Sequence, residues 1–505
     1  MLSSTHRGHQ ALVHMKRSSA IPRTSPSIVR RLSTSVHRQD ALVTRPLPEL
    51  IPRPVPIPAA PRALPVPYLA WPRTPLGAPD EFWRPIPQWK DIPLKDFASW
   101  RWGVKNAVEA KKDKRDKLMD FLHAALPEEV PRAKGLHGLQ SRLEFMADVV
   151  TGLRNSAMSV RIMPYILSRI NWTDPANDPI FRQFIPLGSI MIDDHEFCKL
   201  DSLNEKNDRP VDLIVHRYPD KALFLPTSVC PTYCLFCTRS YGIGANTVEV
   251  TKEHYRGSLD KINAAFDYIE SQEGLHDIVV SGGDAFYLSA DVLESIGDRL
   301  IASKNIERFR FASKGLAVAP HRFLDQEDPW TDTLIRISDR AKRAGKHMAL
   351  HTHFNHPNEI SWITERASLK LLQAGITVRN QTVLLRGVND NVDTMSTLIK
   401  KLGKMAIQPY YVYQCDMVPK IEHLRTPLRT ILDIESQIQG TVAGFYIPKF
   451  VVDLPGGGGK RPASLCESYD RKKGISTFTQ PALKSKGRGD KVYKYYDPVE
   501  FTSGP

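Results

Sequence analysis

The sequence has no long hydrophobic segment and few cysteines, and each absence excludes a class of protein. No run of about 18 apolar residues occurs, so we expect no membrane-spanning helix and no membrane partner. Six cysteines among 505 residues are too few for a disulfide scaffold, which favours a reducing compartment. With 41% hydrophobic and 25% charged residues, the composition is that of a folded protein rather than a disordered one.

Acidic residues are missing from the N-terminus. None precedes Asp40, whereas seven Lys and Arg residues and eleven Ser and Thr residues do. Such a cationic, acid-free and serine-rich start is typical of a mitochondrial presequence, which the membrane potential draws inward. We therefore predict a presequence over residues 1–45, with a processing site near Arg30-Arg31-Leu32, and a location in the mitochondrial matrix. A disordered basic tail is the alternative.

The net charge of +14 is unevenly distributed. Residues 1–90 hold 13 Lys and Arg residues against 4 Asp and Glu residues, so the other 415 residues carry a net charge of only +5. Because the excess lies in a leader and a linker rather than on a folded surface, nucleic acid is not expected as a partner. Fifteen prolines between Pro46 and Pro93 predict an extended linker or arm over residues 46–93. Folded structure should begin near Trp89.

Beyond residue 210, short β-rich runs alternate with segments of helical length. This alternation predicts parallel strands joined by right-handed crossovers. Six such units are too few for a closed eight-stranded barrel, so the predicted fold class is α/β with a partial (β/α)6 barrel, whose chemistry would gather at the carboxyl ends of its strands. The expected strands are Ala222–Pro226, Asp277–Ser281, Arg308–Ala312, His347–His351, Ile376–Leu385 and Pro409–Tyr413. The expected helices are Glu253–Gln272, Ala290–Ala302, Trp330–Ala344, Ser361–Ala374 and Val392–Met405.

The chain divides into six predicted segments. Residues 95–125 and about 137–170 have helical periodicity, whereas Met191–Pro210 is polar and irregular. The segments are the presequence (1–45), the proline-rich arm (46–93), an N-terminal helical region (94–210), the barrel (211–425), a segment that carries a glycine-flanked lysine (426–462) and a tail (463–505).

Three of the six cysteines lie within eight residues. Cys230, Cys234 and Cys237 have the spacing C-x3-C-x2-C, just after the first expected strand. Structural zinc normally takes four protein ligands, whereas three thiolates suit a [4Fe-4S] cluster that keeps one iron open to an outside ligand. Three ordinary buried cysteines are the alternative. The SGGD turn at residues 281–284 follows the next strand, and its glycines would let the backbone approach a ligand closely.

A lysine follows four glycines in the segment VVDLPGGGGKRP. Lys460 does not belong to a phosphate loop of the G-x4-G-K-[ST] type, because Arg461 follows it. A flexible linker is the alternative, but the apolar strand Phe450–Val452 leads straight into the glycines. Pyridoxal 5′-phosphate needs a lysine amine in an open niche lined by backbone, and Lys460 fits that need.

Together these motifs resemble the lysine 2,3-aminomutase family of the radical S-adenosylmethionine superfamily. The C-x3-C-x-aromatic-C spacing is similar to the cluster loop of the superfamily, and the wider match extends over about residues 85–462. The segments that carry it, in the same order as in the family, are HRYPDKALFLPTSVCPTYCLFCTRS, VVSGGDAF, HTHFNHPNEI, RNQTVLLRGVND, YYVYQCD and VVDLPGGGGK.

The resemblance implies three cofactors and a set of residues for each. The cofactors are a [4Fe-4S] cluster, S-adenosyl-L-methionine and pyridoxal 5′-phosphate. The implied cluster ligands are Cys230, Cys234 and Cys237. The implied S-adenosylmethionine contacts are Phe236, Gly282, Gly283, Asp284, His353 and Gln381. The implied pyridoxal phosphate residues are Lys460, which would bind it covalently, Arg217, Tyr218 and Lys221, which stands where the family often has arginine. The implied substrate residues are Arg239, for the α-carboxylate, and Asp416 and Asp453, for a distal ammonium.

The two implied aspartates indicate the class of substrate. They would repel glutamate, and beside alanine they would stay buried without a counter-charge, so a dibasic amino acid fits best. The implied enzyme is an isomerase of the intramolecular aminotransferase type that moves the α-amino group of L-lysine to the β-carbon. One alternative is the same chemistry on ornithine, another amino acid or a protein-bound lysine. Another is a non-enzymatic basic protein that binds nucleic acid or a protein partner.

The C-terminal region departs from the bacterial members of the family. Residues 461–505 hold only Cys466, and the family's internal cysteine position falls near Ala367-Ser368. We therefore expect no zinc, and a homo-oligomer without the zinc site of the family. The basic tail could be a solvated end, a partner site or a substitute lid. An electron donor for the cluster is the remaining expected partner.

Overall fold

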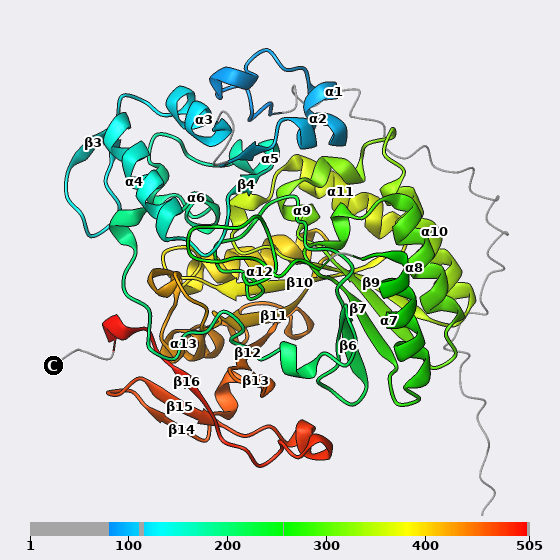
Figure 1. Cartoon of the computed structure of the whole chain (residues 1–505). Helices are drawn as coiled ribbons and strands as arrows, with labels where there is room; N and C mark the ends of the chain where they lie inside the picture. Colours follow the sequence, from blue (N-terminus) through cyan, green and yellow to red (C-terminus); the bar gives the residue numbers. More distant parts are fainter. Residues whose placement is uncertain (1–79, 111–115, 256, 502–505) are drawn as a thin grey trace, which may run out of the picture. The chain divides into compact units, whose positions relative to one another are not determined.

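A nine-stranded mixed sheet forms the centre of the fold (Figure 1). The computed structural model describes residues 80–110, 116–255 and 257–501. The strands of the sheet are β5 (Ile214–Val215), β6 (Lys221–Phe224), β7 (Asp277–Val280), β8 (Arg308–Ala312), β9 (His347–Thr352), β10 (Thr377–Leu384), β11 (Gln408–Gln414), β12 (Lys449–Leu454) and β13 (Gly459–Pro462). They lie side by side in sequence order, with β5 and β13 at the two edges. This open arrangement confirms the predicted partial barrel.

Parallel pairing runs from β6 to β12, and only the two edge strands pair antiparallel. All six expected strands are confirmed. The predicted number of parallel strands was one too low, because β12 adds to the sheet next to β11. The apolar run Phe450–Val452 lies within β12, so the segment that carries the lysine continues the barrel sheet.

Helices connect the successive parallel strands. They are α7 (Leu259–Ser271), α8 (Ala290–Ala302), α10 (Trp330–Arg343), α11 (Trp362–Gln373), α12 (Val392–Lys404) and α13 (Leu428–Ile438); a short α9 (Gly315–Val318) precedes α10. Side chains of Ser258, Ser289 and Asn391 accept backbone N–H groups at the starts of α7, α8 and α12. The Ser258 cap explains why α7 begins at Leu259 instead of at the expected Glu253.

The N-terminal region is less helical than predicted. Its elements are α1 (Leu94–Phe97), α2 (Trp100–Lys105), β1 (Val108–Glu109), α3 (Lys117–Ala125), β2 (Glu129–Pro131), β3 (Leu139–Ser141), α4 (Arg142–Asn155), β4 (Arg161–Ile162), α5 (Pro164–Leu167) and α6 (Phe181–Phe184). Continuous helices over 95–125 and about 137–170 are therefore wrong. Ser99 caps a new helix, β1 leaves the helical path to pair with β4, and Pro164 opens α5. The irregular stretch Met191–Pro210 has no α-helix or strand.

The C-terminal tail folds as a small antiparallel sheet. It consists of β14 (Ser468–Asp470), β15 (Ile475–Phe478) and β16 (Tyr493–Tyr496), with the 3-10 helix η11 (Pro481–Lys486) between the last two strands. Phe478, Tyr493 and Tyr495 are buried in one cluster with Phe450 and Val452 of β12. In Figure 1 these strands, coloured orange to red, follow β12 and β13. Burial of three aromatic side chains explains why the tail is folded rather than a solvated end.

The predicted presequence (1–45) and the predicted arm up to residue 79 lie outside the described residues. Among the helices that the structure describes, none is both long and apolar enough to cross a membrane.

Candidate active site

The cysteine loop after β6 is held against the glycine turn after β7. Gly283 donates its backbone N–H to the carbonyl of Thr227 at 2.6 Å, and Asp284 donates to that of Val229 at 3.0 Å. A Cβ atom on Gly283 would lie only 2.5 Å from the carbonyl oxygen of Val229. Glycine is required there because the two backbones touch. Both motifs thus meet at the carboxyl edge of the sheet, where the fold predicts the chemistry.

Changing Gly283 to alanine should push the cysteine loop away from the turn. We expect a loss of about 1–3 kcal/mol in the free energy of unfolding, since the added methyl overlaps rigid backbone. We also expect less iron and sulfide bound after anaerobic reconstitution. Gly274→Ala is the matched control, because the nearest atom to its Cβ would be a carbonyl oxygen 3.8 Å away. Equal iron contents in the two variants would show that the contact does not hold the loop.

The three thiols of the loop, Cys230, Cys234 and Cys237, form no disulfide. Burial raises the pKa of each thiol, to about 12 for Cys234, and the negative charge of Asp284, followed by those of Cys237 and Cys234, raises the pKa of Cys230 further. Within the described ranges, no group of three His, Cys, Asp or Glu side chains converges on a single metal-ion position. A [4Fe-4S] cluster places each thiolate on a different iron and supplies the positive charge that buried thiolates need. The three residues fit such a cluster.

The residues predicted to contact S-adenosylmethionine lie along this edge of the sheet. The Phe236 ring packs edge-to-face on the His353 imidazole, with 5.8 Å between ring centroids. Burial lowers the pKa of His353 well below its ordinary value, which keeps the imidazole neutral. Gln381 on β10 lies 3.2 Å from the Nδ1 of His351 on β9. Burial raises the pKa of Asp284 to about 6. Their contacts with S-adenosylmethionine stay a prediction.

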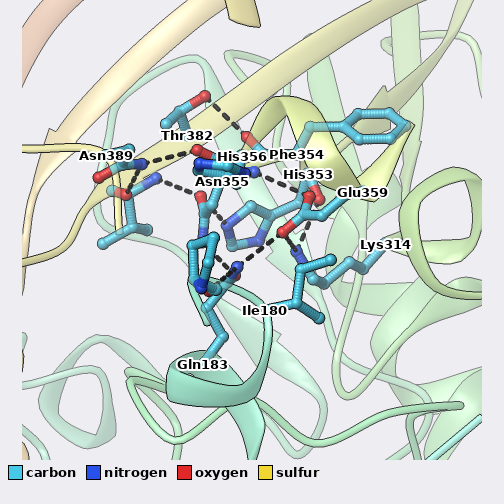
Figure 2. Close-up of polar contacts among 12 residues, drawn as sticks. Ile180, Gln183, Lys314, His353, Phe354, Asn355, His356, Glu359, Thr382 and Asn389 are labelled. Carbon is cyan, nitrogen blue, oxygen red and sulfur yellow. Dashed lines mark hydrogen bonds and ion pairs between the residues drawn. The ribbon is translucent and has the colours of Figure 1, made fainter. Parts of the chain in front are cut away.

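A buried polar network supports this part of the site (Figure 2). Fully buried Glu359 accepts hydrogen bonds from Nε2 of Gln183 at 2.9 Å and from the backbone N–H of Asn355 at 3.0 Å. The side-chain amide of Asn355 donates from Nδ2 to Oε1 of Gln183 at 2.9 Å. Lys314 donates from Nζ to the His353 carbonyl at 2.8 Å and lies 3.8 Å from the Glu359 carboxylate. The network therefore fixes the backbone that carries His353.

Gln183, Lys314 and Glu359 are functional-site residues that were not predicted from the sequence. Gln183 also anchors the cysteine loop, because its carbonyl accepts the backbone N–H of Leu235 at 2.9 Å. Glu359 belongs to the segment HTHFNHPNEI, so its motif offered a signal. Gln183 and Lys314 stand in no motif, and only the fold shows that they belong to the site.

Lys460 on β13 lies opposite Asp453 on β12. Its Nζ donates to Oδ2 of Asp453 at 2.6 Å, and its backbone N–H donates to the Tyr218 hydroxyl at 2.6 Å. Burial lowers the pKa of Lys460, but Asp453 and Tyr413 outweigh burial and hold that pKa well above its ordinary value. Gly459 has a φ of 71°, and a Cβ atom there would collide with the Tyr218 hydroxyl. Tyr218 is thus in contact with the glycine loop, while its contact with pyridoxal phosphate stays a prediction.

The two other predicted pyridoxal phosphate residues differ in their surroundings. Arg217 is buried and donates from Nε to Oδ2 of Asp208 at 2.7 Å. Lys221 is more open, and its Nζ lies 4.2 Å from the centroid of the Tyr218 ring. A primary amine at 460, a glycine-rich backbone and nearby cations together fit pyridoxal 5′-phosphate.

The predicted substrate residues already have partners in the protein. Arg239 donates from Nε and Nη2 to the two carboxylate oxygens of Glu205, each at 2.7 Å. Asp416 accepts a hydrogen bond from the hydroxyl of Thr238. Burial, and then the charge of Asp453, raise the pKa of Asp416 to about 7. Ionisation of the Asp416 carboxyl is therefore less favourable than that of an exposed aspartate.

The hydrogen bond between Thr238 and Asp416 connects the cysteine loop with the part of the site around Lys460. Thr238 directly follows Cys237 of the cysteine loop, while Asp416 lies in the electrostatic field of Asp453 and Lys460. The structure therefore brings the thiols and Lys460 to the same edge of one sheet.

Comparisons with known proteins place the chain in a family. It is 35% identical over 408 residues to L-lysine 2,3-aminomutase of Clostridium subterminale, a match that covers 79% of this chain and 88% of that protein. It is 33% identical over 301 residues to glutamate 2,3-aminomutase of Clostridioides difficile (strain 630), which covers 60% and 66% of the two chains. No protein-family model matches the chain.

Among solved structures, SuiB of Streptococcus suis bound to S-adenosylmethionine is 12% identical, over 47% of this chain and 51% of that chain. The TM-score of that match is 0.32. Because the identity to L-lysine 2,3-aminomutases extends over most of both chains, the chain belongs to the lysine 2,3-aminomutase family of the radical S-adenosylmethionine superfamily.

Proposed function

We propose that the protein moves the α-amino group of L-lysine to the β-carbon and so produces β-lysine. The observation that carries the proposal is the pair of acids at the carboxyl ends of β11 and β12, Asp416 and Asp453, in the same site as Lys460. Two neighbouring carboxylates favour a substrate that brings a positive charge between them. L-Lysine brings that charge on its side-chain ammonium.

Membership of this family implies three cofactors: S-adenosylmethionine, an iron–sulfur cluster and pyridoxal phosphate. When bound, these groups supply the radical that takes a hydrogen from the β-carbon and the conjugated system through which the nitrogen migrates.

The residues of the chain position the substrate for this chemistry. Asp453 is neutralised by Lys460 as long as that amine is not occupied. With the Lys460 amine engaged by a bound cofactor, the Asp453 carboxylate would be available to the ammonium of the substrate. The same ammonium favours the ionised form of Asp416, so lysine binding should lower the pKa of that carboxyl. At the other end, Glu205 holds the guanidinium of Arg239 in one plane, ready for the α-carboxylate.

Two other dibasic substrates fit the same chemistry. Ornithine has the same two charged ends on a shorter chain, and a protein-bound lysine has the same side chain. The relative from Clostridioides difficile acts on glutamate, but glutamate would bring a third carboxylate next to Asp416 and Asp453. The two acids therefore favour a dibasic amino acid.

The test is a product analysis with several amino acids. We incubate anaerobically reconstituted protein with S-adenosylmethionine, pyridoxal phosphate, a reductant and one of L-lysine, L-ornithine or L-glutamate. β-Lysine should form from lysine, with ornithine slower and glutamate unchanged. Turnover of ornithine or glutamate in preference to lysine would contradict the proposed substrate. No turnover of any amino acid by protein that holds a full cluster and pyridoxal phosphate would contradict the proposed reaction.

We also propose that the enzyme works in the mitochondrial matrix, with an electron donor for its cluster and as a homo-oligomer without zinc. The acid-free, arginine-rich start over residues 1–45 supports the location. Retention of the full-length chain in the cytosol would contradict it.

A further inference from the structure

The C-terminal tail contacts the glycine-rich loop that leads into Lys460. Gln480, just before η11, donates from Nε2 to the carbonyl oxygen of Lys460 at 2.8 Å. Arg488, just after η11, also reaches the loop. Its Nη1 lies 3.3 Å from the position that a Cβ atom would take on Gly457. Two side chains of the tail therefore frame the niche around Lys460.

Arg488 shares one carboxylate with Arg217. Oδ2 of Asp208 accepts from Nε of Arg217 at 2.7 Å, while Oδ1 lies 2.6 Å from Nη2 of Arg488. Lys486 is the third cation of this cluster, with its Nζ 2.5 Å from the carbonyl of His216. The three positive charges exceed the single negative charge of Asp208. The next carboxylate, Asp453, lies 3.9 Å from Nη1 of Arg217 and is paired with Lys460, so a net positive charge remains. Such a surplus favours a bound anion.

The two arginines differ in what they can still bind. The side chain of Arg217 is 8% exposed, its Nη2 donates to the Leu203 carbonyl and its Nη1 lies 3.9 Å from Oδ1 of Asp453. Its nitrogens therefore already face protein acceptors. The side chain of Arg488 is 28% exposed, and no described residue accepts a hydrogen bond from its Nη1. Arg488 is the guanidinium that a ligand in the niche can reach.

We propose that Arg488 binds the phosphate of the aldehyde cofactor that Lys460 holds. The proposal rests on the proposed function, because it assigns a further residue to the same cofactor. A phosphate monoester is a dianion whose oxygens match the parallel N–H groups of a guanidinium. Asp208 holds Arg488 by one edge and leaves Nη1 directed at the glycine loop. The tail, which has no part in the chemistry itself, thereby completes the cofactor niche.

The test compares pyridoxal 5′-phosphate with pyridoxal, which lacks the phosphate. We measure the affinity of the full-length protein for each aldehyde from the absorption band of the adduct with Lys460. Arg488→Gln should weaken binding of pyridoxal phosphate about 10- to 100-fold and leave pyridoxal within about twofold, because only the phosphate contact is lost. Inorganic phosphate should compete with pyridoxal phosphate in the unchanged protein and less in Arg488→Gln. Lys484→Gln, an exposed charge loss in η11, is the matched control.

The outcomes separate the possible failures. Equal weakening of both aldehydes would mean that Arg488 only fastens the tail to Asp208, and would overturn the proposal. An unchanged preference for the phosphorylated aldehyde would overturn it as well. Retained pyridoxal uptake shows that the variant is folded; if Arg488→Gln fails to fold, Arg488→Lys should show a smaller loss confined to pyridoxal phosphate. A wild-type chain that takes up neither aldehyde would contradict the proposed function itself.

Discussion

Replacing Lys460 by alanine should eliminate covalent binding of pyridoxal phosphate and lower β-lysine formation by at least about 1,000-fold. The amine of Lys460 is the only part of the side chain that can form the bond, and its neighbours on β12 and β13 offer no second amine at that position. The cysteine loop follows a different strand, so iron and sulfide contents should stay unchanged. Absorption spectra of the anaerobically purified variant, combined with iron and sulfide analysis, measure both effects on one sample.

Lys449→Ala is the matched control for Lys460→Ala. Lys449 begins β12, at the opposite end of the strand from Asp453, and is exposed. This variant should keep both the cofactor band and the activity. A Lys460→Ala protein that still binds pyridoxal phosphate covalently would show that another lysine holds the cofactor, and would remove the basis for the assigned site.

Asp416→Asn should lower kcat/KM for L-lysine by about 100-fold or more, since removing one acid from a desolvated ion pair typically costs about 3–5 kcal/mol. Asparagine keeps the size of the side chain and can still accept the Thr238 hydrogen bond. The cofactor band should therefore be retained. Asp453→Asn should cause a similar loss of activity, and it should also release Lys460 from its ion pair.

The control for the acid variants is Asp433→Asn, an exposed position on α13. It should leave kcat/KM unchanged. Both active-site variants are assayed with lysine, ornithine and glutamate, because loss of negative charge should reduce the discrimination against glutamate. Unchanged lysine turnover in Asp416→Asn and in Asp453→Asn would show that these carboxylates do not bind the substrate ammonium.

The barrel could be predicted from the sequence because its strands and helices are set by local patterns. Each expected strand is a short β-rich run between helical segments, and capping residues such as Ser289 mark where helices begin. The N-terminal region could not be predicted in the same way. The helical periodicity of 95–125 is interrupted where β1 pairs with β4, a strand about 50 residues further along the chain. A contact between residues so far apart in the chain cannot be detected from a short stretch of sequence.

In the candidate site, the residues that stand in motifs could be predicted, whereas the residues that hold them in place could not. Cys230, Lys460 and the other motif residues stand in segments whose order and spacing could be recognised. The acids that orient the arginines could not be found, because Glu205 and Asp208 lie in an irregular stretch without periodicity. Arg488 belongs to a tail whose basic residues look alike in the sequence. Only folding shows which of them reaches the glycine loop.

We propose that the iron–sulfur site and the lysine-bound cofactor share one pocket. The most direct measurement is a crystal structure of the anaerobically reconstituted protein with S-adenosylmethionine and pyridoxal phosphate. We expect a [4Fe-4S] cluster on Cys230, Cys234 and Cys237. Pyridoxal phosphate should be bound to Lys460 on the same side of the sheet, with S-adenosylmethionine between the cluster and pyridoxal phosphate. Electron density for the cofactor on Lys460 in a cavity closed off from the cluster would contradict it.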